Sequence, residues 1–282
     1  QVHAQGHRSQ DRLSGMSLPV AEIGVFGGTA FYSWLDDVEE VVVQTPYGAP
    51  SAPLAVGHVE GRAVAFLTRH GPGHSVPAHR INYRANLWAL RRLGVRRVLA
   101  PSSVGSLQPQ VKPGDLVVVD QLVDRTSGRA DTFFDGPLPA HVTFADPYCP
   151  ELGGVTLAAA RAEGVPVHEG GTVVVIQGPR FSTRAESQWF SAAGWSVVNM
   201  TQYPEAALAR ELGMCYSGLA LVTDYDAGVE RAEAVTMETV FRVLAENIEK
   251  VKGVLLRAIP AIPTSVGCEC GAGALDPGMN ST

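Results

Sequence analysis

The 282 residues are 45% hydrophobic and 18% charged, which is enough apolar side chain for one large α/β domain or two small ones. The formal net charge of −6 and the lack of a basic cluster argue against a nucleic-acid partner. No apolar run approaches the roughly 20 residues that span a bilayer, and no basic segment followed by an apolar stretch opens the chain. We therefore expect a cytoplasmic protein with neither a membrane partner nor a signal peptide.

The two ends of the chain differ in composition from the rest. Residues 1–18 are polar and aperiodic, which predicts a disordered leader. Residues 264–282 are rich in Gly, Ser and Pro, which predicts a flexible C-terminal tail. Residues 19–263 contain no linker, repeat or low-complexity tract, so we expect them to form one compact domain.

Strand-like and helix-like segments alternate along this domain. Short apolar runs predict strands at 23–26, 63–68, 96–101, 115–120, 171–178, 196–200 and 216–223. Helical periodicity predicts helices at 82–93, 183–194, 204–212 and 234–258, several of them closed by a glycine. The alternation is typical of an α/β fold in which helices flank a central sheet.

Most of these strands end in polar side chains at their carboxyl ends. The residues at these ends are Thr29, Arg69, His70, Ser102, Ser103, Met200, Thr201, Asp224 and Asp226. Ligand sites in open α/β sheets lie at the carboxyl ends of the strands. We therefore expect these side chains to converge on one pocket.

Two of the strand ends have features of an anion site. The glycines before Thr29 expose backbone N–H groups beside a hydroxyl, although a plain tight turn is the stronger interpretation of that motif alone. Arg69 offers a guanidinium fork and His70 a further donor, with a solvated loop as the equal alternative. Pro72 and Pro77 break the helical spacing that nearby histidines would need to bind a metal, so we expect no metal here.

The remaining strand ends suggest sugar and base contacts. Met200 can pack on the apolar face of a sugar and Thr201 can donate to an anion, although a strand end capped by Thr is the simpler interpretation. Asp224 and Asp226 lie two residues apart after an apolar strand, so both face one side in extended geometry. Burial of both raises the pKa of one and lets it donate a proton, whereas an exposed acidic turn would not. No nucleophile motif accompanies them, so acid catalysis and anion placement are expected.

The four cysteines have no CxxC spacing and no histidine-rich tract beside them. This pattern argues against a zinc site, so no metal is expected anywhere in the chain. Cys149 and Cys215 are expected to be ordinary small core residues. Cys268 and Cys270 are expected to be reduced thiols, with a strained disulfide between them as the alternative.

Taken in chain order, these segments resemble the trimeric purine nucleoside phosphorylase family, and within it the branch that acts on methylthioadenosine. The resemblance covers about residues 21–263 and rests on GGT (27–29), RHGPGH (69–74), NYRANLWAL (82–90), SSVGSL (102–107), PGDLVVVDQLVDRT (113–126), DPYCP (146–150), GPRFSTRAES (178–187), NMT with PEAALARE (199–211) and TDYD (223–226). It implies a single-domain fold around a distorted mixed sheet flanked by helices. It also implies a homotrimer with active sites at the subunit interfaces.

The resemblance assigns roles to individual residues. It implies a phosphate site at Thr29, Arg69, His70, Ser102, Ser103 and Thr201. It places Met200 on the ribose, Phe181 and Ser182 against the base, and Asp224 and Asp226 on adenine, with Asp224 as the general acid. It assigns Met237, Val240 and Phe241 to the pocket for the 5′ group, and His141 to the same pocket in a neighbouring subunit.

Two features bear on how closely the chain follows the family. Where many relatives have Thr-Thr-Ala before the GSL segment, this chain has Pro101-Ser102-Ser103, which keeps the hydroxyl donor. The Cys268-Glu269-Cys270 segment is similar to a Cys-x-Cys in some relatives, where the cysteines support stability.

The expected activity is phosphorolysis of methylthioadenosine to adenine and 5-methylthioribose 1-phosphate, with inorganic phosphate as co-substrate and no cofactor. A first alternative is a 6-oxopurine nucleoside or methylthioinosine phosphorylase. Enzymes of that preference usually have Asn where this chain has Asp224. A second alternative is a non-catalytic nucleoside-binding protein, which would have no reason to keep every phosphate donor.

Overall fold

The computed structural model describes residues 18–27, 36–136, 140–229 and 236–272. The strands are β1 (Ile23–Phe26), β2 (Asp36–Val41), β3 (Leu54–Val59), β4 (Arg62–Leu67), β5 (Arg97–Ser106), β6 (Leu116–Val119), β7 (Gln121–Arg125), β8 (Val167–Glu169), β9 (Thr172–Ile176), β10 (Val197–Asn199) and β11 (Cys215–Tyr225). The helices are α1 (Tyr83–Arg92), α2 (Pro150–Ala162), α3 (Arg184–Ala192), α4 (Gln202–Glu211) and α5 (Met237–Ala261), with short 3-10 turns at Pro72–His74 and Ala78–Arg80. No helix among them is long and apolar enough to cross a membrane.

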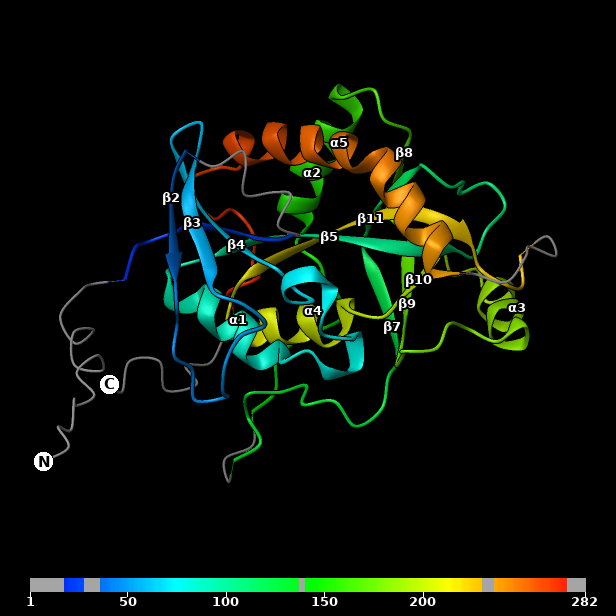
Figure 1. The fold of residues 1–282 in the computed structure, drawn as a ribbon, viewed down its shortest axis with the longest axis horizontal. Helices are drawn as coiled ribbons and strands as arrows, with labels where there is room; N and C mark the ends of the chain where they lie inside the picture. Colours follow the sequence, from blue (N-terminus) through cyan, green and yellow to red (C-terminus); the bar gives the residue numbers. More distant parts are fainter. Residues whose placement is uncertain (1–17, 28–35, 137–139, 230–235, 273–282) are drawn as a thin grey trace, which may run out of the picture.

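The eleven strands form one mixed sheet, in the order β2-β3-β4-β1-β5-β10-β9-β7, with β11 paired to β5 and β6, and β8 paired to β6. Around the centre, β4, β1, β5 and β11 are parallel, whereas β10 is antiparallel to β5. Figure 1 shows β5 and β11 crossing the middle of the molecule, with α2 and α5 on one side and α1 and α4 on the other. The expected mixed sheet flanked by helices is confirmed.

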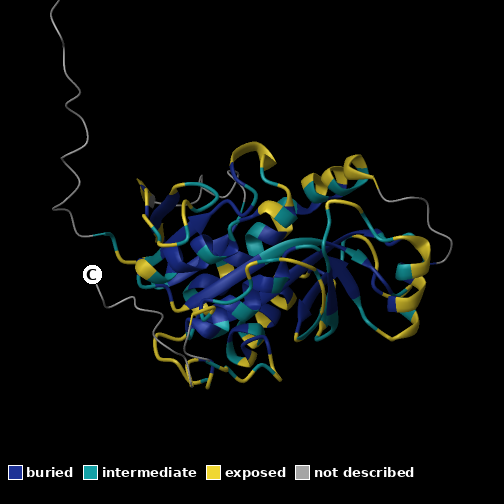
Figure 2. Ribbon diagram, turned by 90° about the horizontal axis from the view of Figure 1, so that it is seen from below, coloured by how far each residue is buried: buried dark blue, intermediate teal, exposed yellow. Residues whose placement is uncertain are grey.

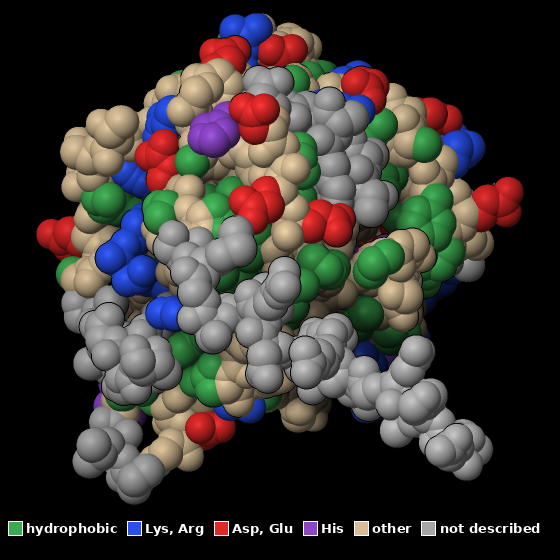
Figure 3. All heavy atoms as spheres, turned by 60° about the vertical axis from the view of Figure 1, so that its left-hand side comes forward, with side chains coloured by type: hydrophobic (Ala, Val, Ile, Leu, Met, Phe, Trp, Pro, Cys, Tyr) green, Lys and Arg blue, Asp and Glu red, His purple; other side chains and the backbone are tan. Residues whose placement is uncertain are grey.

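Two apolar cores lie on opposite faces of the sheet. One core packs α1 and α4 against the sheet through side chains such as Leu87, Leu90 and Leu208, and the other packs α2 and α5 through Leu157 and Leu255. The strands between the helices are almost wholly buried (Figure 2). Burial on both faces explains why these strands have near-continuous apolar sequences. On the face drawn in Figure 3, acidic and basic side chains are interspersed and no basic patch forms.

Several elements differ from the sequence-based expectation. The strand expected at 96–101 continues to Ser106, because β10 and β11 pair with it on both sides beyond Pro101. The charged edge strand β2 and the glycine-containing helix α2 lack the apolar periodicity that would have indicated them. The predicted leader at 1–18 lies almost entirely outside the described residues.

Residues 264–272, the first part of the expected tail, make polar contacts with the domain. Arg97 donates to the carbonyl oxygen of Ser265 (2.7 Å), and Glu151 accepts from the backbone N–H of Gly267 (3.3 Å). Cys270 is buried at the end of this segment. Contacts with β5 and α2, which lie far away in sequence, therefore hold a segment whose composition is typical of a tail. Residues 273–282 lie outside the described part of the chain.

Candidate active site

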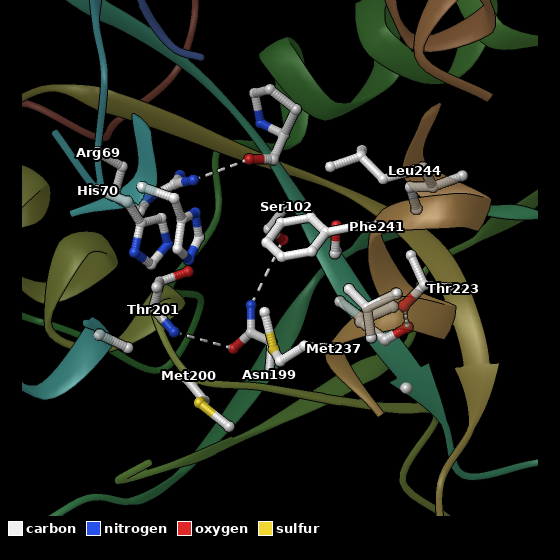
Figure 4. Close-up of a pocket in the computed structure, with 18 of the residues that line it drawn as sticks. Arg69, His70, Ser102, Asn199, Met200, Thr201, Thr223, Met237, Phe241 and Leu244 are labelled. Atoms are coloured by element: carbon white, nitrogen blue, oxygen red, sulfur yellow. Dashed lines mark hydrogen bonds between the residues drawn. The ribbon is translucent and has the colours of Figure 1, made fainter. Parts of the chain in front are cut away.

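A cavity of about 880 Å³ lies at the carboxyl ends of β1, β4, β10 and β11, beside the second half of β5 and the first turns of α5 (Figure 4). Its volume is within the range of small-molecule sites. It is lined by every sequence-predicted site residue except Thr29, which lies outside the described residues, and His141, which is exposed elsewhere. The expected convergence of polar strand ends on one pocket is thus confirmed for the described residues.

Arg69 lies at one end of the cavity, in a buried ion pair with Glu205 of α4. Its Nε and Nη2 atoms donate to the two Glu205 carboxylate oxygens at 2.6 and 3.1 Å, and its Nη1 donates to the carbonyl oxygen of Pro101 at 3.0 Å. Tyr216 donates a further hydrogen bond to Glu205 at 2.7 Å. A guanidinium has five N–H donors, so two remain for an anion after these three bonds. Three of the N–H groups expected to be free for phosphate therefore hold Arg69 in place instead.

Ser102 has a hydroxyl oriented by two amides. Gln202 Nε2 donates to Ser102 Oγ at 3.2 Å, and Asn199 Nδ2 donates at 3.4 Å (Figure 4). Because the hydroxyl oxygen already accepts from both, its one proton is left to donate to a ligand. The Asn199 carbonyl oxygen also accepts from the backbone N–H of Thr201 at 3.4 Å, which ties the two hydroxyl residues into one network.

Thr68 adds a donor that sequence reasoning missed. It is buried and lines the cavity immediately before Arg69, and its Oγ1 has no hydrogen-bond partner among the described residues. A buried hydroxyl without a partner costs free energy unless a ligand or water satisfies it. The signal was available in the sequence, because Thr68 ends the same apolar run that leads to Arg69.

His70 follows Arg69 in the cavity lining, and one of its ring nitrogens is bound to the backbone. Its Nδ1 lies 2.9 Å from the carbonyl oxygen of Val76, which can only accept, so Nδ1 carries the proton. Burial, together with the charge of Arg69, lowers the pKa of His70 to about 4. The ring is therefore neutral near pH 7, with Nε2 as an acceptor. In this state the Nε2 atom of His70 can accept a hydrogen bond from a protonated phosphate oxygen.

Asp224 and Asp226 lie at the other end of the cavity, and both are buried. Burial raises the pKa of Asp224 to about 6. A hydrogen bond from Thr223 acts to lower this pKa, and the charge of Asp226 acts to raise it. Burial also raises the pKa of Asp226, while the Ser187 hydroxyl beside it acts in the opposite direction. Asp226 Oδ2 and Ser182 Oγ have no hydrogen-bond partner within the described structure. The expected buried carboxyl pair is present, with polar atoms left for a ligand.

A β-bulge directs Asp224 into the cavity. Val222 pairs with Val104 and Asp224 pairs with Gly105, so Thr223 is the extra residue in β11. A bulge of this kind re-aims the next side chain. A Cβ atom at Gly105 would lie 3.0 Å from Asp224 Oδ2, so a side chain here would displace the carboxyl group by a few tenths of an ångström.

The first turns of α5 provide an apolar wall. Met237, Val240 and Phe241 all line the cavity, although Met237 and Phe241 are each 44% exposed. The Phe241 ring contacts His74 edge-on at 5.7 Å, and His74 in turn stacks on His70 at 4.0 Å. The wall therefore reaches from the helix to the anion end, and part of it remains open to solvent in the single chain. Leu244 and Ile248 extend the same wall and were not predicted.

Met200 lines the cavity next to Asn199 and Thr201 (Figure 4). Its Sδ atom packs so close to Gly178 that a Cβ atom there would lie 2.6 Å away, and Gly178 has a positive φ of 65°. Phe181 and Ser182 follow this glycine and line the cavity beside it. Among the described residues, the only group of side chains suited to hold a metal is a set of four cysteines, none of which lines the cavity.

The family model described as the phosphorylase superfamily matches residues 22–260. A protein of Streptomyces coelicolor named purine nucleoside phosphorylase is 57% identical over 92% of this chain and 97% of its own length. A protein of Mycobacterium tuberculosis named S-methyl-5′-thioadenosine phosphorylase is 56% identical over 87% of this chain and 91% of its own length.

Solved structures agree with these sequence relatives. A methylthioadenosine phosphorylase from an Antarctic soil metagenomic library has a TM-score of 0.86 and 39% identity, covering 90% of this chain and 91% of its own. A methylthioadenosine phosphorylase of Schistosoma mansoni, in complex with adenine, has a TM-score of 0.83 and 37% identity, covering 87% of this chain and 93% of its own. The fold and the site thus define an enzyme that transfers a pentosyl group to phosphate. The chain belongs to the phosphorylase superfamily.

Proposed function

We propose that the protein cleaves methylthioadenosine with inorganic phosphate, giving adenine and 5-methylthioribose 1-phosphate. The observation that carries this proposal is the order of chemistry along one cavity. Anion donors lie at one end, two buried carboxyl groups at the other, and an apolar wall runs beside them. This order suits a phosphate, a purine and an apolar 5′ group joined through one ribose.

The anion end supports attack by phosphate at the ribose C1′ atom. Two N–H groups of Arg69 and the hydroxyls of Thr68, Ser102, Ser103 and Thr201 are available as donors around it. As the C1′–N9 bond breaks, positive charge develops on the ribose and the phosphate anion stabilises it. One phosphate oxygen then bonds to C1′ and the adenine leaves.

The carboxyl end supports departure of the base. Adenine leaves more readily when its N7 is protonated, and Asp224, with a pKa raised to about 6, can deliver that proton. Asp226 can accept from the exocyclic amine of the base, since its Oδ2 atom has no partner among the described residues. All chemical steps are thus assigned to side chains and phosphate, with no cofactor and no metal in the reaction.

A 6-oxopurine nucleoside phosphorylase is the second candidate, because the Streptomyces coelicolor relative is named only as a purine nucleoside phosphorylase. A 6-oxopurine has N1–H and O6 where adenine has an acceptor and an amine. Asp226, which accepts from the amine of adenine in this proposal, offers no donor to O6 when it is ionised. This mismatch favours adenine.

We further propose that the enzyme works as a cytoplasmic homotrimer. The wall formed by Met237 and Phe241 is half-exposed in a single chain, and a neighbouring subunit that covers it would close the 5′ end. His141 lies outside the cavity of its own chain, so it is available to contribute to the site of a neighbour.

Base release from four nucleosides, measured with and without phosphate, tests the proposed function. Methylthioadenosine, adenosine, methylthioinosine and inosine form the panel. We expect phosphate-dependent release that is fastest with methylthioadenosine. Release without phosphate would indicate a hydrolase, binding without release would indicate a non-catalytic protein, and a preference for inosine would establish the second candidate.

A further inference from the structure

All four cysteines of the chain lie in one cluster outside the cavity. Cys149 caps the N-terminus of α2, Cys215 begins β11, and Cys268 and Cys270 lie in the segment after α5. Their sulfur atoms all lie within 4.8 Å of one another. Cys268 Sγ is 3.5 Å from Cys149 Sγ and 3.3 Å from Cys215 Sγ. Three of the four residues are buried and Cys268 is half-buried.

We propose that this cysteine cluster binds one Zn²⁺ ion through four sulfur ligands. With Zn–S bonds of about 2.3 Å, the sulfurs of a tetrahedral site lie about 3.8 Å apart. The two closest distances here are 3.3 and 3.5 Å and no pair exceeds 4.8 Å, so small side-chain movements produce that geometry. A closed set of four cysteines is typical of structural zinc sites. Two disulfides would require the sulfurs to separate into pairs, whereas here Cys268 is about equally close to Cys149 and Cys215.

The surroundings of Cys149 favour a thiolate. The backbone N–H of Leu152 in the first turn of α2 donates to the Cys149 sulfur at 3.4 Å. A helix N-terminus stabilises a negative sulfur. Zn²⁺ would displace the protons of the remaining thiols, so binding would release protons and become tighter as the pH rises.

Arg97 and Glu151 hold the cluster in place without a metal. Arg97 is the parallel partner of Cys215 in the sheet, and it donates to the carbonyl oxygens of Pro263 and Ser265 at 3.0 and 2.7 Å. Glu151 pairs with Arg97 at 3.4 Å and accepts from the backbone of Gly267 at 3.3 Å. The segment that carries Cys268 is thus fixed beside α2 and β11 by polar contacts, and the positive Arg97 partly offsets the net negative charge of a zinc tetrathiolate.

The proposal predicts one zinc ion per chain. We would express the full chain in zinc-supplemented medium, purify it without chelator and measure zinc by mass spectrometry of the metal. Cobalt exchange should then give the near-ultraviolet charge-transfer band and intense visible bands of a tetrahedral cobalt tetrathiolate. Because the chain has only four cysteines, every thiol that reacts with a thiol reagent belongs to this cluster. We expect the thiols to react slowly while the metal is bound. After a chelator removes the metal under denaturing conditions, we expect all four thiols to react.

Variants in the segment after α5 localise the site. Cys268→Ser with Cys270→Ser should lose the zinc and the cobalt spectrum, whereas the matched change Glu269→Ser, at the exposed residue between them, should keep both. Chelation should lower the Tm of the wild-type chain and leave that of the double variant unchanged. A wild-type protein without zinc overturns the proposal, whether its four thiols all react at once or none react until a reductant opens two disulfides.

Discussion

At the scale of single residues, the structure changes the meaning of Arg69. The sequence offers an arginine after a strand, and a free guanidinium fork for phosphate is the natural interpretation. In the folded chain, the fork is bound to Glu205, which is fully buried. Arg69 is therefore held in a buried ion pair, and we expect its two remaining N–H groups to bind the anion.

We expect Arg69→Ala to lower the free energy of unfolding by about 3–5 kcal/mol, because it leaves the buried Glu205 carboxylate without its charge partner. Urea unfolding of the variant measures this loss. Arg69→Ala with Glu205→Ala should recover part of it, since no stranded charge remains. If the single variant is as stable as wild type, the pair has no structural role.

Arg69→Lys, which keeps the charge, should raise the KM for phosphate more than that for the nucleoside.

Asp224 is expected to be the general acid. Asp224→Asn should lower kcat/KM for methylthioadenosine by at least about 10²-fold, because a proton donor at N7 is lost. It should also improve the relative activity on 6-oxopurine nucleosides. In wild type, kcat/KM at saturating phosphate should fall as the pH rises above about 6, the pKa of Asp224, and Asn at this position should remove that dependence. An unchanged substrate ranking in the variant would place Asp224 outside the base site.

The free energy of unfolding of Asp224→Asn shows whether its loss of activity is due to misfolding. Burial raises the pKa of Asp224 from 3.8 to about 6 in the folded chain, so the folded state keeps the proton that the unfolded state releases. Ionised Asp224 therefore destabilises the fold as the pH rises from about 4 to 6, and the full cost is present above that range. Asp224→Asn should raise the free energy of unfolding above pH 6, by up to about 3 kcal/mol, and leave it unchanged near pH 4. A variant that is less stable at both pH values would point to a structural role.

At the scale of elements, the pairing of β5 with β11 positions the carboxyl end of the site. The bulge at Thr223 aims Asp224 toward Gly105, which has no side chain to obstruct it. We expect Gly105→Ala to reduce kcat/KM by about 10²-fold, because a small misplacement of a catalytic group is costly. Gly154→Ala is the control, since a Cβ atom at this position of α2 meets nothing within 4 Å. Equal activity of the two variants would show that the Asp224 carboxyl group tolerates displacement.

The first turns of α5 are expected to select the 5′ group. An apolar wall discriminates a methylthio group from a hydroxyl by roughly 10–200-fold, so methylthioadenosine should exceed adenosine in kcat/KM by about that factor. Met237→Ser should narrow the ratio mainly by weakening the methylthio substrate. Glu238→Ser, at the next residue and outside the cavity lining, should leave the ratio unchanged. A ratio that Met237→Ser does not alter would assign this helix face to packing alone.

At the scale of the whole molecule, the site is open where Met237 and Phe241 are half-exposed, and we expect neighbouring subunits of a trimer to close it. Light scattering should give three times the mass of one chain. His141→Ala should raise the KM for methylthioadenosine without lowering the Tm, because His141 is exposed and lies outside the cavity of its own chain. A monomer of full activity, or an unchanged KM, would contradict this assembly.

Features that depend on local patterns could be predicted from the amino-acid sequence. Apolar runs and glycine stops located the central strands and helices, and the polar residues after those strands marked the cavity, because parallel strands bring their carboxyl ends to one edge. Burial of Asp224 and Asp226 could be predicted because they follow an apolar strand. The residues of the 5′ wall came from a family resemblance, since periodicity alone would have assigned them to the core.

Contacts between residues far apart in the sequence could not be predicted in this way, because they depend on how the chain packs. The partners Arg69 and Glu205 are 136 residues apart, and Cys149 and Cys268 are 119 residues apart. No local period encodes such contacts, because they arise from how the helices pack on the sheet. The bulge in β11 likewise depends on its pairing with β5. Packing therefore determined which groups Arg69 binds, where Asp224 points and that the four cysteines converge.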